Sequence, residues 1–393
     1  MRRRLLVGVL AVLVPAALVL GVFVGGHPRL LPGFVRDALV GDTQAQVYDE
    51  ALGRISDDFF RPVDKGRLLD TSLTAAVASL HDRFSRYIDP KAYNDFEDST
   101  NGNFDGVGLS VAEVPQGLRI MTVFDGGPAK KAGLRPGELI VAVDGRSLQG
   151  KRSDASTNQI KGPAGTSVRL TVQRAGKRRD ITLERAKVVV PVSEQRLETR
   201  DGRKIGYVSL SGFTAGAHGY VLQNVRSLLK RGAKGIVLDL RQNGGGLLEE
   251  GVLVASIFVP DGLIVSTHGR NRPTHRFNAS GDAIATDIPV AVLVDAGTAS
   301  ASEIVTGALQ DRRRATVVGT RTFGKGVFQE IETLANGGAL DITVGEYFTP
   351  KGRNLGPRDG KRGLTPDVQA RDDPKTKPDE ALRKALGVVA GKL

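Results

Sequence analysis

The sequence contains no cysteine and no tryptophan, and only two methionines and five histidines among its 393 residues. Without cysteine, the chain has no disulfide, no thiolate metal site and no cysteine nucleophile. The net charge of +12 suits an anionic partner, but no long basic run is interleaved with aromatic side chains, so we expect no nucleic-acid binding. Hydrophobic residues make up 40% and charged residues 25%, which is typical of a folded protein. The length of 393 residues is typical of two or three domains.

The N-terminus carries a long apolar run. Leu5–Val24 contains no charged or polar side chain and follows three arginines at positions 2–4. As a helix, the run would cross a hydrocarbon core of about 30 Å, with the N-terminus held in the cytoplasm by the arginines. No clean Ala-x-Ala site ends it, which favours an uncleaved anchor at residues 1–26 over a cleaved signal peptide. Either way, we expect the bulk of the chain to work outside the cytoplasm, at the cytoplasmic (inner) membrane or secreted.

Residues 27–102 are interpreted as a linker and a small helical region. Apolar residues recur at helical spacing there, as in Leu52, Ile55 and Phe59. At the other end, residues 373–393 are polar at first and then weakly helical over Glu380–Leu386. We interpret this last segment as a polar tail.

Residues 103–187 carry an ordered set of glycine-rich motifs. They are Gly106–Val111, Gly127–Gly145 and Ile160–Gly165, followed by two alternating strands around a turn at Gly176. This set resembles a PDZ domain, which binds a peptide as an added strand and holds its terminal carboxylate in backbone amides. The resemblance implies a carboxylate loop of Asp105, Gly106, Val107 and Gly108, with Leu109 and Val111 on the adjoining strand. The alternative is a small β domain that only separates other parts of the chain.

Residues 188–372 repeat a strand–loop–helix pattern. The strand Ile236–Leu240 leads into a glycine-rich loop and a helix, and the strand Val290–Val294 leads into Asp295–Ala299 and a helix over Ser300–Gln310. If the two strands are parallel, both loops lie at the carboxyl edge of the sheet, where sites form in open α/β sheets. A third strand is expected at Thr316–Gly319.

Gly297–Ile304 is the most informative segment. Ser300 and Glu303 have the spacing of a capping box, so a plain helix start explains them. The same position also suits a nucleophile, because free amides and the positive end of the helix dipole would stabilise an oxyanion.

A serine nucleophile needs a base. None of the five histidines sits in a recognisable catalytic motif and no Gly-x-Ser-x-Gly elbow occurs, which disfavours a Ser-His-Asp hydrolase. Lys325 stands between two glycines and before apolar residues, and a buried lysine can act as a base when it is neutral; a surface turn is the alternative. Gly319–Gly326 nearly spells a P-loop, but Gly326 stands where Ser or Thr is required, so we expect no nucleotide.

Together these motifs resemble the carboxyl-terminal processing peptidases, or tail-specific proteases, from about Ala51 to Val368. The resemblance implies an α+β multidomain chain with a small N-terminal helical region, a PDZ domain and a mixed α/β peptidase core of ClpP/crotonase-like type. It implies Ser300 as nucleophile, Lys325 as base and Gln329 as the residue that orients the lysine. It further implies oxyanion donors from Gly246 or Gly245 and from Ala301. Ser302 is the alternative nucleophile.

The sequence therefore predicts a serine endopeptidase that cleaves exported proteins near apolar C-termini through an acyl-enzyme, with no metal or other cofactor. The rivals are a PDZ adaptor with an inactive core and a histidine-dependent esterase. The sequence leaves open whether the chain forms a homo-oligomer.

Overall fold

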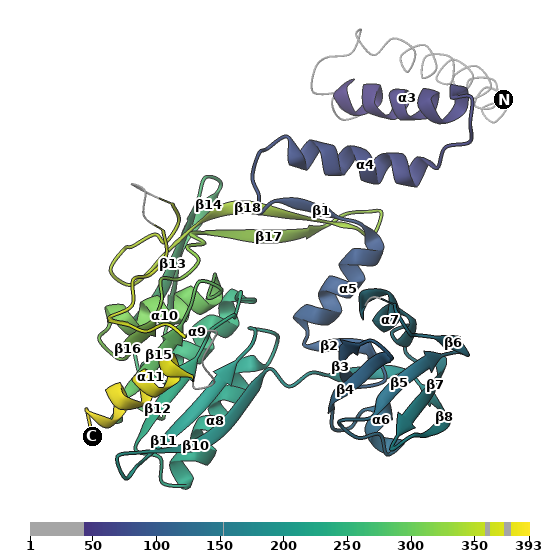
Figure 1. Ribbon diagram of the computed structural model, residues 1–393. Coiled ribbons are helices and arrows are strands. Elements are labelled where there is room, and N and C mark those ends of the chain that lie inside the picture. The colour runs from purple at the N-terminus through teal and green to yellow at the C-terminus, as the bar shows by residue number, and fades with distance from the viewer. Residues whose placement is uncertain (1–42, 152, 358–361, 373–378) are drawn as a thin grey trace, which may run out of the picture. The chain divides into compact units, whose positions relative to one another are not determined.

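The computed structural model describes residues 43–151, 153–357, 362–372 and 379–393, so the predicted anchor at residues 1–26 lies outside the described residues. The chain divides into two compact units, Met1–Arg83 and Phe84–Leu393 (Figure 1). Across the described ranges, no helix combines the length and the apolarity that a membrane span requires.

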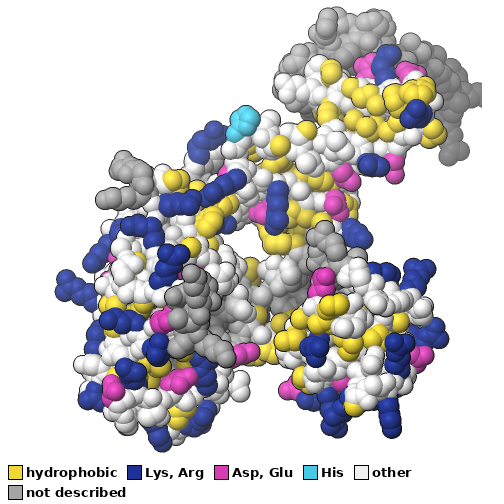
Figure 2. Space-filling model, viewed as in Figure 1, with side chains coloured by type: hydrophobic (Ala, Val, Ile, Leu, Met, Phe, Trp, Pro, Cys, Tyr) yellow, Lys and Arg dark blue, Asp and Glu magenta, His cyan; other side chains and the backbone are white. Residues whose placement is uncertain are grey.

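The first unit contains two helices, α3 (Thr43–Asp58) and α4 (Lys65–Ala78), where the apolar spacing predicted them. The α4 helix begins at Asp64, whose carboxylate accepts hydrogen bonds from the first-turn amides. These helices bury little of their apolar surface, as Figure 2 shows. The large apolar side chains that stay exposed in this unit are Val47, Tyr48, Ile55, Phe59, Phe60 and Leu80.

The second unit opens with a strand, which the prediction of a helical region did not include. β1 (Arg86–Ile88) pairs antiparallel with β18 (Ala339–Phe348), and α5 (Pro90–Thr100) follows at the N-cap Asp89. The strand forms because Ile88 is buried against the sheet and Pro90 restricts the residue before it to extended backbone. The other strands of this sheet are β13 (Leu263–Gly269), β14 (Arg272–Asn278) and β17 (Val327–Thr333).

The predicted PDZ segment forms a β-rich module with its own apolar core. Its main sheet has the order β3-β4-β5-β7-β8, with β6 beside β5, and a separate ribbon joins β2 to β9. Large buried side chains such as Leu118, Ile140 and Leu170 fill the core. The elements are β2 (Asn103–Gly106), β3 (Leu109–Val114), β4 (Gly117–Val123), α6 (Pro128–Lys131), β5 (Leu139–Val143), β6 (Arg146–Ser147), α7 (Ser153–Ile160), β7 (Ser167–Arg174), β8 (Lys177–Glu184) and β9 (Ala186–Val189).

The predicted peptidase core contains a six-stranded sheet in the order β10-β11-β12-β15-β16-β19. Every neighbouring pair is parallel except β10 with β11. The strands are β10 (Ser193–Arg200), β11 (Arg203–Leu210), β12 (Gly235–Asp239), β15 (Val290–Val294), β16 (Thr316–Gly319) and β19 (Val368–Gln369). The helices of the core are α8 (Ala217–Lys230), α9 (Leu248–Ser256), α10 (Ala301–Asp311) and α11 (Glu380–Ala390).

Both faces of this sheet are covered. In β15, Val292 belongs to the apolar cluster that contains α8, α9 and α10, whereas its neighbour Leu293 belongs to the cluster that contains α11. Burial on both faces explains why β15 consists of apolar residues alone and why β12 is apolar up to its last residue, Asp239. Because β12 and β15 are parallel, the loops after Asp239 and after Val294 meet at one edge, as the sequence predicted.

The C-terminal segment is not the polar tail that we predicted. The α11 helix extends to Ala390 and buries one stripe of its surface against the sheet. The apolar residues that form this stripe are Ala381, Leu382, Ala385, Leu386, Val389 and Ala390. The prediction failed because the polar linker dominates the local composition, while the helical period emerges only over the last residues of the chain.

We expect Leu386→Ala to lower the free energy of unfolding by about 2–4 kcal/mol, because it opens a cavity under α11. The matched control Lys384→Ala, on the exposed face of the same helix, should change it by less than about 0.5 kcal/mol. Urea denaturation measures both. Equal stability of the two variants would mean that α11 is not part of the core.

Candidate active site

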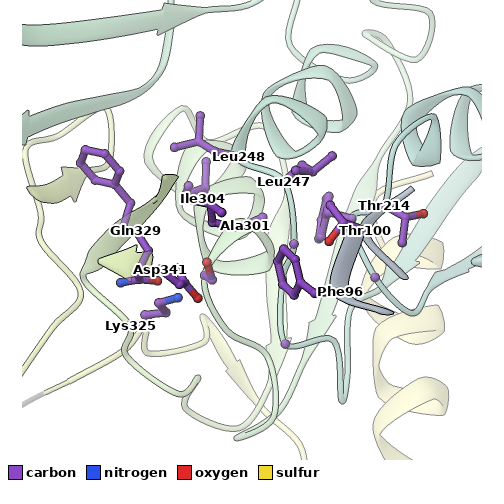
Figure 3. Close-up of a pocket in the computed structure, with 18 of the residues that line it drawn as sticks. Phe96, Thr100, Thr214, Leu247, Leu248, Ala301, Ile304, Lys325, Gln329 and Asp341 are labelled. Carbon is purple, nitrogen blue, oxygen red and sulfur yellow. The ribbon is translucent and has the colours of Figure 1, made fainter. Parts of the chain in front are cut away.

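A cavity of about 440 Å³ lies where the carboxyl edge of the core sheet meets the β17–β18 sheet and α5. It brings together all six catalytic and oxyanion residues that the sequence predicted: Gly245, Gly246, Ser300, Ala301, Lys325 and Gln329. Figure 3 shows Lys325, Gln329 and Asp341 on one side of it, and Phe96 and Thr100 of α5 on the other. The chain positions of these residues are far apart, so only the fold assembles them.

Ser300 stands directly before the first residue of α10 and has φ of +56°, which is rare for a residue other than glycine. The preceding turn is held by Asp295, whose carboxylate accepts from the Gly297 amide, and by Thr298, whose hydroxyl donates to the Leu240 carbonyl. Strained backbone of this kind persists at sites where the surroundings fix it. It presents the serine at the edge of the cavity, beside the helix N-terminus.

Two residues that line the cavity with Ser300 have backbone amides without an acceptor among the residues that the structure describes: Gly246 and Ala301. The Gly245 amide is different, because it donates to Oδ1 of Asn243 at 2.9 Å. Of the two glycines that the sequence offered as donors, Gly246 is therefore the one with a free N–H group. An amide pair of this kind can stabilise developing negative charge on an oxygen.

Glycine is required at position 245. A Cβ atom there would lie 2.7 Å from Cβ of Ser300 and 2.9 Å from the Ala301 nitrogen, so any side chain would displace the serine. The segment is held in place by a parallel bridge, in which the Phe213 amide donates to the Gly245 carbonyl and the Leu247 amide donates to the Phe213 carbonyl. The glycine-rich loop, residues 241–246, is thus held in a fixed position beside Ser300, and we call it the strap.

Arg241 anchors the start of this strap. Its guanidinium donates to Asp239 in β12 and also to Asp372 and Asp379 in the C-terminal segment. Burial alone would lower the pKa of Arg241, but the hydrogen bonds to Asp239 and Asp379 raise it. Burial alone would likewise raise the pKa of Asp379, and the hydrogen bonds from Arg241 and the Leu382 amide lower it instead.

The buried carboxylate of Glu303 connects Ser300 to the loop that carries Lys325. Its Oε2 accepts from the amides of Ser300 (3.1 Å) and Lys325 (2.9 Å), and its Oε1 accepts from the Gly324 amide and the Thr322 hydroxyl. Burial raises the pKa of Glu303, and the four hydrogen bonds act in the opposite direction. The sequence suggested only a capping box with Ser300 here. The structure shows that the carboxylate of Glu303 also accepts hydrogen bonds from the loop that contains Gly324 and Lys325.

Lys325 lies in the loop between β16 and β17. Its own carbonyl accepts from the Tyr347 hydroxyl, and the next carbonyl, of Gly326, accepts from the Asn354 amide at 2.7 Å. Its Nζ lies 5.1 Å from the centre of the Phe84 ring, within reach of a cation–π contact. The sequence gave Phe84 no role, and its place beside Lys325 is known only from the structure. The segment continues into a strand, not the helix that a P-loop needs.

Of two further residues that the sequence offered for the site, Gln329 lines the cavity and Ser302 does not. Gln329 lines the cavity, but its Nε2 donates to Oγ1 of Thr343 at 3.0 Å, and the described residues hold no hydrogen bond between it and Lys325. Ser302 is fully buried, and its hydroxyl donates to the Asn243 carbonyl, so it does not reach the cavity. None of the four described histidines lines the cavity, and His27 lies outside the described residues.

The predicted peptide-binding residues divide between two elements. Asp105 and Gly106 belong to β2 and pair with β9, whereas Val107 and Gly108 lie between β2 and β3. The Asp105 carboxylate accepts from the Ala164 amide, and its negative charge would repel a peptide carboxylate. The amides of Val107 and Gly108 have no acceptor among the described residues.

Leu109 and Val111 lie on β3, which is an edge strand of the main sheet in the predicted PDZ segment. The backbone groups of an edge strand can pair with an added strand.

We expect Glu303→Gln to lower the labelling rate of Ser300 by a serine-reactive acylating probe by about 100-fold, and the free energy of unfolding by about 1–3 kcal/mol. The reason is that, whichever way the glutamine amide is turned, its NH₂ group would face at least one backbone N–H donor. The exposed control Glu332→Gln should change neither quantity. Unchanged labelling in Glu303→Gln would contradict a role for this carboxylate in positioning the serine and the lysine.

The lowered pKa of Asp379 predicts how stability depends on pH. A depressed carboxyl pKa adds stability above the unfolded pKa of about 4, and this stability is lost as the pH falls through the folded value. Asp379→Asn, which retains an N-cap side chain, should therefore be less stable than the wild type at pH 7 and approach it near pH 3. Urea midpoints across this range test it, with Asp125→Asn as an exposed control; a difference that is constant with pH would contradict the ion pair's contribution.

Comparison with known proteins agrees with this geometry. The model of peptidase family S41 matches residues 204–370, and a PDZ model matches residues 119–174. The carboxyl-terminal-processing protease of Synechocystis sp. is 39% identical over 312 residues, which cover 78% of this chain and 72% of that one. The carboxy-terminal-processing protease of Bartonella bacilliformis is 36% identical and covers 82% and 74%.

Among solved structures, the photosystem II D1 C-terminal processing protease matches with a TM-score of 0.52 and 32% identity, over 89% of this chain and 91% of that one. The chain therefore belongs to the carboxyl-terminal processing serine proteases of peptidase family S41.

Proposed function

We propose that this protease is an endopeptidase with a Ser300–Lys325 dyad, and that it cleaves exported proteins near their C-termini. The observation that carries the proposal is one cavity lined by Ser300, Lys325 and the two unpartnered amides of Gly246 and Ala301. Those groups are what acyl transfer needs: a nucleophile, a base and donors for the oxyanion.

The reaction begins when neutral Lys325 takes the proton of the Ser300 hydroxyl. The serine oxygen attacks the peptide carbonyl, and the amides of Gly246 and Ala301 stabilise the resulting oxyanion. The protonated lysine then gives its proton to the leaving amine, and an acyl-enzyme remains on Ser300. Water adds to the ester with the lysine again as base, and this step releases the new C-terminus and restores the serine.

Gln329 orients Lys325 in this proposal. Its amide is held from one side by Thr343, and it stands four residues after the lysine on the strand that lines the cavity. The Arg86–Asp341 ion pair, with 3.1 Å between Nε and Oδ2, contributes further charged groups to the same wall. Apolar side chains complete the lining, among them Phe96, Leu248 and Ile304, which suits an apolar substrate side chain.

The PDZ domain captures the apolar C-terminus of the substrate. The free amides of Val107 and Gly108 support this role, because a terminal carboxylate needs such donors, and the edge strand β3 can pair with the residues that precede it. The apolar run Leu5–Val24 after the three arginines supports an N-terminal membrane anchor, with the catalytic part outside the cytoplasm.

The test is cleavage of a reporter protein with an apolar C-terminus. Ser300→Ala and Lys325→Ala should each lower kcat/KM by about 10³-fold or more, because nucleophile and base act as a unit. The matched control is Ser302→Ala, in the same motif, which should keep most of the activity. Trapping the acyl-enzyme and mapping it by mass spectrometry should find the acyl group on Ser300.

Full activity in Ser300→Ala or Lys325→Ala, or an acyl group on another residue, would overturn the dyad. A second substrate series with amidated C-termini separates capture from chemistry. If the PDZ domain holds the carboxylate, amidation raises KM, and equal cleavage of the two series would contradict capture.

A further inference from the structure

Among the residues that the structure describes, strand β17 has one edge without a strand partner. Its one described partner is β18, whereas both edges of β18 are occupied, by β17 on one side and by β1 and β13 on the other. An edge strand presents a row of N–H and C=O groups that can pair with another extended chain. The position of this edge matters because β17 begins two residues after Lys325.

The residues that face outward on β17 can be identified from the ladder. The Leu334 amide donates to the Gly338 carbonyl, and the Thr343 amide donates to Ser85 on the opposite edge of β18. Backbone groups alternate in an antiparallel pair, so Glu330 and Glu332 bond to β18. The backbone groups of Gln329, Ile331 and Thr333 therefore point away from β18. The side-chain bond between Gln329 and Thr343 agrees, because side chains approach most closely at non-hydrogen-bonded pairs.

The outward edge is open where the cavity lies. Gln329 and Ile331 both line the cavity that holds Ser300, whereas Thr333 is approached by the Tyr93 hydroxyl of α5 at 3.3 Å. The usable stretch thus spans two outward residues, which lie roughly 7 Å apart along the strand. That spacing matches residues i and i+2 of an extended peptide.

We propose that the substrate chain adds to β17 as an extra strand, with hydrogen bonds from two of its residues to the backbone of Gln329 and Ile331. This inference rests on the proposed function and specifies how the scissile segment is held beside Ser300. Pairing positions the peptide by its backbone, which every substrate shares, and leaves its side chains to the apolar lining. It also sets a requirement: proline, which has no N–H group, is excluded from the two paired substrate positions.

The test on the substrate side uses the wild-type enzyme and one cleavable peptide. Each residue within five positions of the scissile bond is replaced in turn by its N-methyl form. We expect two sensitive positions on one side of the bond, separated by one insensitive residue, each with kcat/KM lower by about threefold to tenfold, as for one lost hydrogen bond. A flat profile, or sensitivity without alternation, would overturn the proposal.

The test on the enzyme side compares Ile331→Pro with Ile331→Ala. Both remove the side chain, but only proline removes the outward N–H group, and proline is tolerated at such edge positions. Ile331→Pro should have kcat/KM about threefold to tenfold below Ile331→Ala, mainly through KM, and should no longer respond to N-methylation at one of the two positions. The matched control is Glu332→Ala. The Glu332 side chain lies on the opposite face of β17 from that of Ile331, so this variant should have the kcat/KM of the wild type.

Equal kinetics of Ile331→Pro and Ile331→Ala would overturn the proposal. If Ile331→Pro fails to fold by circular dichroism, the N-methyl series decides alone. The failure of strand addition is distinguishable from the failure of the proposed function. Loss of cleavage in Ser300→Ala together with a flat N-methyl profile retains the dyad and rejects the added strand, whereas an unaffected Ser300→Ala rejects the dyad itself.

Discussion

The geometry of the active site depends on one buried carboxylate. Glu303 accepts hydrogen bonds from the amides of Ser300, Gly324 and Lys325 and from the Thr322 hydroxyl. These donors belong to two loops that follow different strands, so a single side chain fixes the backbone of Ser300 relative to the backbone of Lys325. Burial strengthens this connection, because each donor would be left unsatisfied in the protein interior if the carboxylate were lost.

A second connection reaches the other wall of the site from the end of the chain. Arg241 begins the strap that carries the Gly246 amide, and its guanidinium is shared by Asp239, Asp372 and Asp379. The C-terminal helix α11 thereby contributes twice: its apolar stripe covers one face of the core sheet, and its N-cap residue fixes the start of the strap. Arg241 therefore couples the stability of this segment to the position of the glycine-rich loop that contains Gly246.

The sequence predicted the parts of the fold that local patterns encode. The run Val290–Val294 gave a buried strand at its observed bounds, and the serine motif gave the start of α10 within one residue. Predictions failed where a pattern depends on a distant partner. β1 is a strand because it pairs with β18, and α11 belongs to the core because it packs on one face of the sheet.

For the site, the sequence by itself determined the chemical groups: a serine at a helix start, a lysine between glycines and a glycine-rich loop, together with the absence of any thiol. Their spacing could not show contact, since 25 residues separate Ser300 from Lys325. Only the tertiary structure decided that Gly246 rather than Gly245 has the free amide and that Phe84 lies beside Lys325. It also decided that the Ser302 hydroxyl donates its hydrogen bond to a buried backbone carbonyl. The physical reason is that hydrogen-bond partners and burial belong to the packed chain, whereas residue type and local period belong to the sequence.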